Sequence, residues 1–354
     1  MKSFLGFLFG LFCALMIVFI AGENPLTILS ILIKSSFGSK YDFGLTLFYM
    51  TSLIFTGLSV SVAFKSGLFN IGAEGQLNFS AIAMVSFAMA YPQLGMPSSL
   101  LAILFIGVLA GATWGALPGL LKAYRGSHEV IVTMMLNFIS AGISSYLISQ
   151  YLQNPDSQNP ESAVIAESFR TNSFDFLNQF FPESPVNLFF LVSIATAIAI
   201  HFFFSRSAVG YEMIAVGENP SAAERANISS KKFVVLSLTL SGILASGAAM
   251  NEVIGYSGQY KIGFSPEFGF MGIAVALMSN NSPLGIIANA FIMSVFHKGA
   301  SDLDIETETI TKDFSKVIQA LVLFGVGLQY YINKSGFKIN FPGRNSKKKP
   351  KGNS

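Results

Sequence analysis

The sequence predicts an all-α protein that crosses a membrane many times, on three observations. Hydrophobic residues make up 52% of the 354 residues and charged residues 12%, whereas about 25% of an average soluble domain is charged. The mean hydropathy is +0.56. Apolar runs of spanning length, about 20 residues, recur along the chain. These runs do not alternate in polarity as the strands of a transmembrane barrel do, so helices are the expected spanning elements.

About ten apolar segments are expected to cross the membrane, and together they form a single transmembrane domain over residues 1–333. The first segment follows Lys2 and has no small-residue cleavage site followed by a soluble domain, so we interpret it as an uncleaved helix. The segments lie at 3–21, 44–64, 69–91, 98–121, 130–151, 187–205, 233–254, 268–280, 283–298 and 315–333.

Basic residues predict which side of the membrane each loop faces. With ten crossings, the basic loops 122–125 and 225–232 lie on the same side as both termini. Because cytoplasmic loops carry an excess of Lys and Arg, this side is predicted to be the cytoplasm. The lysine-rich tail, 334–354, is expected to be a disordered cytoplasmic segment that faces lipid rather than nucleic acid.

The segment 67–84, GLFNIGAEGQLNFSAIAM, places polar side chains inside an apolar run. A polar group in a spanning segment costs roughly 2 to 3.5 kcal/mol, so it normally faces protein or a water-filled path. Neighbouring glycines favour close packing and a break in the helix. The segment is therefore predicted to line a translocation route, although a structural hydrogen bond is an open alternative for Glu74. The candidate path residues are Asn70, Glu74 and Gln76, with Asn137, Asn251 and Glu252 on other segments.

Two of the ten segments, 268–280 and 283–298, are unusually short and are separated by an Asn-Asn-Ser-Pro sequence. Short or interrupted segments in the two halves of a transporter indicate a central path between two repeats. The glycine-broken segment 67–84 has the matching position in the first half. A duplication relating helices 2–5 to helices 7–10 is compatible with this pattern, which alone does not decide it.

Two extracytoplasmic loops each have two interpretations. The polar loop 152–186 contains four prolines and is either a docking surface or a solvated connector. The loop 255–270 carries Tyr256, Tyr260, Phe264, Phe268 and Phe270. These aromatic residues form either an interfacial belt or an outer gate.

The largest cytoplasmic loop, 205–232, is predicted to contain a short helix that begins at Asn219 and Pro220, since proline is tolerated in a first helical turn. A short helix lying on the cytoplasmic surface is suited to contact a separate motor protein and to transmit its movement to the membrane domain. An ordinary loop helix is the alternative. The candidate coupling residues are Gly217, Asn219, Pro220, Ala222, Ala223 and Ala226, the alanines forming a small-residue face.

Four motifs, in order along the chain, resemble those of one transporter family. They are FNIGAEGQ at 69–76, EVIVTMMLNFI at 129–139, GYEMIAVGENPSAAERANIS at 210–229 and FGFMGIAVALMSNNSPLG at 268–285. Together they resemble the ABC-transporter permeases that import nucleosides and simple sugars, in the branched-chain amino acid and ribose permease superfamily. The resemblance implies a bacterial inner-membrane subunit that pairs with a second permease, is driven by a separate ATP-binding subunit and receives substrate from an extracytoplasmic binding lipoprotein.

The sequence departs from the family pattern at a few positions. Met271 stands where family members often carry an acidic residue, and Ser279 and Asn280 stand where a Gly-Arg pair is common. In the loop 205–232, Glu224 and Asn227 replace the usual basic residue and glycine. These departures concern the substrate more than the transporter class, so nucleoside import is the leading interpretation and import of a simple sugar such as ribose or galactose the alternative.

Other chemistry has little support in the sequence. An ion-coupled carrier is expected to show paired ionisable groups at mid-membrane depth, and Glu74 and Glu252 are the candidates. No G-x-x-x-x-G-K-[ST] phosphate loop occurs, so ATP hydrolysis is expected on another subunit and this chain is not expected to be an enzyme. Cys13 is the one cysteine. The three histidines lack metal-ligand spacing, and we expect neither a metal nor a cofactor.

Overall fold

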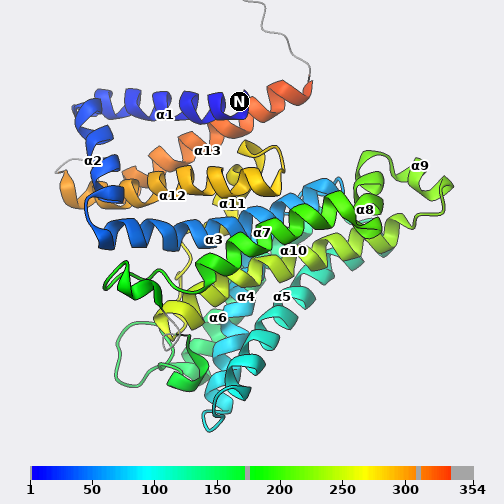
Figure 1. The fold of residues 1–354 in the computed structure, drawn as a ribbon, viewed down its shortest axis with the longest axis horizontal. Helices are drawn as coiled ribbons and strands as arrows, with labels where there is room; N and C mark the ends of the chain where they lie inside the picture. Colours follow the sequence, from blue (N-terminus) through cyan, green and yellow to red (C-terminus); the bar gives the residue numbers. More distant parts are fainter. Residues whose placement is uncertain (1, 172–175, 308–311, 336–354) are drawn as a thin grey trace, which may run out of the picture.

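A computed structural model describes residues 2–171, 176–307 and 312–335, and these residues form helices joined by loops (Figure 1). No β-strand occurs among the described residues, where two isolated bridges join loop segments. The helices are α1 Lys2–Ile20, α2 Pro25–Phe37, α3 Lys40–Lys65, α4 Ala73–Ala90, α5 Ser98–Arg125, α6 Glu129–Leu147, α7 Phe189–Arg206, α8 Ala208–Glu218, α9 Pro220–Arg225, α10 Ser230–Glu252, α11 Phe268–Met278, α12 Pro283–Glu306 and α13 Lys312–Ser335.

Five of these elements are long and apolar enough to cross a membrane by themselves, which agrees with a polytopic membrane protein. α6 and α10 each continue into a single π-helical turn, at Ile148–Leu152 and Val253–Ser257. The five spans are Lys40–Lys65, Ser98–Arg125, Glu129–Leu152, Phe189–Arg206 and Ser230–Ser257.

Helix α3 is the centre of the bundle, and most of its side chains are buried. Helices α10, α11 and α12 pack against it, whereas few residues of α6 and α7 are buried. Helices α1 and α13 pair along one edge of the molecule, far from the group formed by α4, α5 and α6 (Figure 1). Exposed apolar side chains on the outer helices are the surface expected of a protein whose solvent is lipid.

Small residues permit the closest helix contact, between α5 and α10. A Cβ atom added to Gly242 of α10 would overlap the backbone of Gly111, and its next neighbour would be Cα of Gly115 at 3.2 Å. Membrane helices associate by such close backbone approach because lipid provides no hydrophobic driving force between them. The α5–α10 pair therefore forms a rigid frame beside α4.

The observed helices differ from the predicted segments in two places. Helix α2 was not among the predicted segments, because its 13 residues are too few to cross a membrane. Helix α12 is 24 residues long and ends at Glu306, beyond the predicted 298. The apolar run ends at Lys298, but the helix continues because this buried ammonium group forms ion pairs with Asp302 and with Asp42, the latter at 3.6 Å.

Other predicted features are confirmed. The helical structure is interrupted at 67–72 between α3 and α4, and Gly67 in this interruption has a φ of +72°. Helix α11 is short, with 11 residues. The predicted short helix at Asn219 and Pro220 is α9, although the same loop also contains α8. Part of the predicted loop 152–186, namely 172–175, and nearly all of the predicted tail, 336–354, lie outside the described residues.

Candidate functional site

Asn70 lies in the break before α4 and is the centre of a buried polar cluster. Its amide nitrogen donates to Ser241 Oγ at 2.7 Å and to Gln76 Oε1 at 3.2 Å, and its amide oxygen accepts from the Gly72 N–H at 2.7 Å. Ser241 of α10 also donates to the Ser59 carbonyl of α3 at 2.7 Å. The break is therefore fixed by polar contacts to both α3 and α10.

Asn137 joins α6 to the same break. Its amide oxygen accepts from the Gly75 N–H at 2.8 Å, and its amide nitrogen donates to the Ile71 carbonyl at 3.0 Å. These are backbone groups at the start of α4, where a helix leaves N–H groups without an intrahelical partner. Asn137 thus satisfies the interrupted backbone, and its side chain is only partly buried.

Glu74 joins the first turns of α4 and α11. Its Oε2 accepts from the Gly269 N–H at 2.7 Å, and a Cβ on Gly269 would lie 2.6 Å from Glu74 Cα. A carboxyl group is favourable at this place because two helix N-termini, each with a positive dipole end, meet there. The structural hydrogen bond considered for Glu74 is present, and a role in the route stays a prediction.

Asn251 and Glu252 lie apart from the cluster at Asn70. Asn251 is fully buried near the end of α10, and its amide nitrogen donates to Ser52 Oγ of α3 at 2.9 Å. It also accepts from Asn187 Nδ2 at 3.0 Å. Ten residues of helix, about 15 Å, separate it from Ser241. The structure therefore brings together Asn70, Gln76, Asn137 and Glu74, but not these two.

The loop between α10 and α11 closes over α4 and α6. Tyr260 is 2% exposed, and its hydroxyl group donates to Asn78 Oδ1 of α4. Ser144 of α6 contacts the same oxygen at 3.4 Å. Burial raises the pKa of Tyr260 to about 12, so the hydroxyl keeps its proton at neutral pH. A buried tyrosine does not belong to an interfacial belt, whereas Tyr256 is 48% exposed.

The long loop 152–186 holds Tyr260 in place. The Ser162 N–H donates to the Tyr260 carbonyl at 2.8 Å, and the Tyr260 N–H donates to Ser162 Oγ at 3.0 Å. Arg170 donates to the Tyr256 carbonyl at 2.9 Å. The two loops therefore form one cover on the side of the bundle opposite α8 and α9 (Figure 1).

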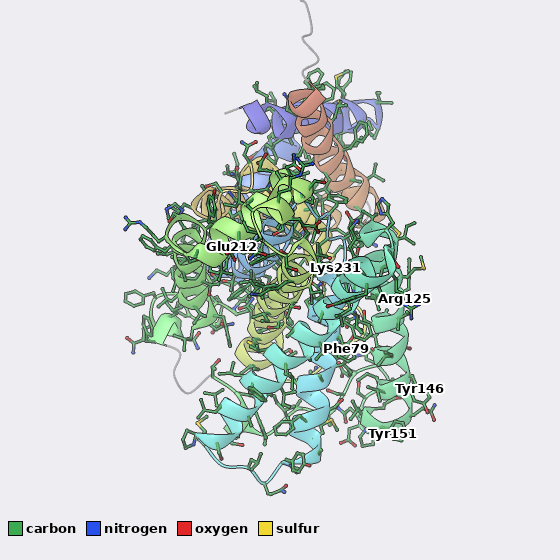
Figure 2. All side chains as sticks on the ribbon, turned by 90° about the vertical axis from the view of Figure 1, so that its right-hand side faces the viewer. Phe79, Arg125, Tyr146, Tyr151, Glu212 and Lys231 are labelled. Atoms are coloured by element: carbon green, nitrogen blue, oxygen red, sulfur yellow. The ribbon has the colours of Figure 1, made fainter. Side chains whose placement is uncertain are left out.

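Three buried polar atoms near the candidate route have surroundings that the sequence did not predict. Two of them belong to Ser80 and Trp114, which were not among the predicted site residues, and the third belongs to Gln76, which was. Gln76 Nε2, Ser80 Oγ and Trp114 Nε1 are buried and find no hydrogen-bond partner among the described residues. The Trp114 ring of α5 stacks on Phe79 of α4, with centroids 4.1 Å apart. Single serines and aromatic residues are common in membrane helices, so no sequence signal distinguished Ser80 and Trp114 from the others. Figure 2 labels Phe79 toward the centre of the molecule, and on the outer surface it labels Tyr146 of α6 and Tyr151 of the π-helical turn that follows α6.

The predicted coupling loop contacts the break before α4 directly. A Cβ on Gly217 of α8 would lie 2.8 Å from the Gly67 nitrogen. Asn219 caps α9 by accepting from the Ala222 N–H at 3.1 Å. Ala222 and Ala226 are exposed, but Ala223 is 4% exposed and packs within this chain. The expectation that Ala223 presents its side chain to a partner is therefore wrong, because that face of α9 turns inward.

The described residues form a helical bundle with a polar cluster at a helix break, a cover at one end and a helical projection at the other. This is the architecture of a membrane transport permease. The chain belongs to the family of permease components of branched-chain amino acid transport systems, whose model matches residues 43–327. No solved structure gives a significant match.

Three ABC transporter permeases are similar to this chain over at least 75% of their own length. The nucleoside ABC transporter permease protein NupB of Lactococcus lactis is 34% identical over 92% of this chain and 89% of its own. The guanosine ABC transporter permease protein NupP of Bacillus subtilis is 33% identical over 95% of each chain. The glucose ABC transporter permease protein TsgB13 of Haloferax volcanii is 30% identical over 80% of this chain and 75% of its own.

Proposed function

We propose that this chain is the membrane subunit of an ATP-driven importer and forms the path for nucleosides. The likeness to NupB and NupP over at least 89% of each chain carries the proposal. Uptake of labelled guanosine by cells with and without the gene tests it. Loss of guanosine uptake on deletion, restored by the gene, is the expected result, and unchanged uptake in the deletion strain would refute it.

A simple sugar is the second candidate substrate, and the similarity to the Haloferax glucose permease favours it. Labelled ribose, galactose and glucose belong in the same uptake assay. Uptake of a free sugar that depends on the gene, without uptake of guanosine, would favour this second candidate.

The proposed path passes the break before α4. Asn70, Gln76, Asn137 and Glu74 supply its polar groups, and the cover that holds Tyr260 closes it on the extracytoplasmic side. On the other side Gly217 abuts Gly67, so a displacement of α8 and α9 reaches the break through a direct backbone contact. The movement of a separate ATP-binding subunit would act on the path through this contact.

Ten crossings are proposed, within one transmembrane domain over 1–333 in a bacterial inner membrane. They are α1, α3 to α7 and α10 to α13, with α2, α8 and α9 outside the bilayer. The beginning of α1 and the end of α13 point to the side on which α8 and α9 project (Figure 1), which supports cytoplasmic termini. The meeting of the α4 and α11 N-termini at Glu74 supports a duplication relating α3–α6 to α10–α13.

The partners are proposed from the family. They are an ATP-binding subunit on α8 and α9, a second permease, identical or different, and a substrate-binding lipoprotein on the extracytoplasmic cover. Purification of the tagged chain from its native membrane tests this arrangement. Recovery of the chain without an ATP-binding subunit would contradict it.

The orientation predicts that a cysteine at position 219 is accessible from the cytoplasm. In a Cys13→Ser background, Asn219→Cys should react with a membrane-impermeant thiol reagent in inverted vesicles and not in intact cells. A cysteine at exposed position 164, in the loop 152–186, is the control with the reverse pattern. Labelling of position 219 in intact cells would overturn the orientation.

The exposed face of α9 predicts a loss of coupling when Ala222 is replaced by arginine. The added charged side chain should separate α9 from the ATP-binding subunit, so uptake falls at least about tenfold, a cost of roughly 1.4 kcal/mol. Ala222→Ser keeps the small volume and serves as the matched control. Co-purification of the ATP-binding subunit measures the contact, and unchanged co-purification with Ala222→Arg would contradict the assignment.

A further inference from the structure

A cavity of about 350 Å³ lies between the loop before α11 and the helices α11, α12 and α13. Its polar side is formed by Glu267, His297, Lys316 and Gln319, and Met271 and Leu323 contribute apolar surface. Small-molecule sites commonly measure about 300 to 1,000 Å³ and combine apolar walls with a few convergent polar groups. The cavity has the size and the composition of such a site.

Among the four polar side chains, His297 is buried, Gln319 is half-buried, and Glu267 and Lys316 are exposed. His297 is 4% exposed and lies 3.4 Å from Gln319 Oε1 through its Nδ1 atom. The Tyr49 ring, 4.9 Å away, holds the imidazole from the side of α3. Glu267 has a φ of +65°, a left-handed conformation that non-glycine residues seldom adopt. A strained residue held beside a cavity is a typical feature of a binding site.

The cavity lies beside the contact that Glu74 makes with α11. Ser265, which lines the cavity, accepts from the Phe268 N–H at 3.2 Å, and Glu74 accepts from the next N–H, that of Gly269. The N–H groups of Phe270 and Met271 donate to the Glu267 carbonyl. The start of α11 therefore has no free N–H group for an anion, and the carboxylate of Glu267 would repel a phosphate.

We propose that this cavity binds the neutral nucleoside during import, with the base against Met271 and Leu323 and the ribose hydroxyl groups toward Glu267, Lys316 and Gln319. This inference rests on the proposed function and adds the form of the substrate. Glu267 and Lys316 carry opposite charges, which suits a neutral ligand with donors and acceptors. The apolar wall favours a nucleoside over free ribose, which lacks a flat apolar face.

Calorimetric titration of the purified complex in nanodiscs, without the binding lipoprotein, tests the inference with guanosine, ribose and guanosine monophosphate. Guanosine should bind at least about tenfold more tightly than the other two. Leu323→Trp fills the cavity and should abolish guanosine binding. Leu328→Trp is the matched control, since this residue is on the same helix and exposed. Equal guanosine affinity in Leu323→Trp and the wild type would overturn the inference.

Glu267→Gly is a second variant that should remain folded, because glycine adopts positive φ without strain. It should weaken guanosine binding and narrow the difference in affinity between guanosine and guanosine monophosphate. An unchanged difference would refute the role of Glu267. If Leu323→Trp transports and binds guanosine normally, the cavity inference fails and the proposed function stands. If the wild type neither binds nor imports guanosine, the proposed function itself fails.

Discussion

Replacing Glu74 by leucine is expected to abolish nucleoside uptake while the complex still assembles. The substitution removes a carboxyl group from a partly buried position between α4 and α11, where its Oε2 accepts from the Gly269 N–H. An apolar side chain at this depth does not hinder membrane insertion. Uptake of labelled guanosine should fall at least about tenfold, which corresponds to roughly 1.4 kcal/mol in the transport barrier.

Glu74→Gln separates the two roles of this residue. Its amide oxygen still accepts the Gly269 N–H, so the contact between the helices is kept and the carboxylate is lost. Uptake at a changed rate with normal assembly is expected. Ser86→Ala is a control on the same helix, since its hydroxyl group donates to the Ile82 carbonyl within α4. Wild-type uptake in Glu74→Leu would show that Glu74 does not serve the route.

Cross-linking the cover to α4 is expected to stop transport reversibly. Tyr260 and Asn78 meet by a hydrogen bond between their side chains, so cysteines at both positions come within reach of a short bifunctional methanethiosulfonate, which joins two thiols through disulfide bonds that a reductant cleaves. In a Cys13→Ser background, the doubly substituted protein should lose guanosine uptake on treatment and regain it on reduction. The loss is expected because loop 258–267 must leave α4 for substrate to enter.

The single variants Tyr260→Cys and Asn78→Cys, treated with the same reagent, control for the effect of modification alone. Each should lose far less uptake than the cross-linked pair. Electrophoresis of a variant with a protease site in the loop 152–186, which lies between positions 78 and 260 in the sequence, measures the extent of cross-linking. Full uptake in a fully cross-linked sample would mean that the cover does not open during transport.

The helical class followed from composition, because a chain with so few charges and repeated apolar runs must bury its backbone hydrogen bonds in helices within lipid. Local chemistry likewise predicted the break at 67–72, from its glycines, and α9, from the Asn219 cap and Pro220. Helix ends were less predictable. The end of α12 depends on the ion pair of Lys298 with Asp42, which is distant in sequence.

The candidate site was predicted only in part. Asn70 and Gln76 do share one buried cluster, whereas Asn251 has the same residue type but bonds to Ser52 and Asn187 elsewhere. Ala223 belongs to the small-residue pattern of α9, yet its face turns inward. The residue types alone therefore did not show which residues line the path, which pack within the chain and which contact a partner. These roles depend on which neighbour each side chain meets.

The sequence by itself determined the class of protein, the helix break and the short helix of the loop 205–232, since each depends on composition or on residues a few positions apart. The tertiary structure alone decided that Glu74 reaches Gly269, that Tyr260 bonds to Asn78 and that Gly217 touches Gly67. Each of these contacts joins helices or loops far apart in the chain. Such contacts arise from the packing of the whole bundle, which no local pattern encodes.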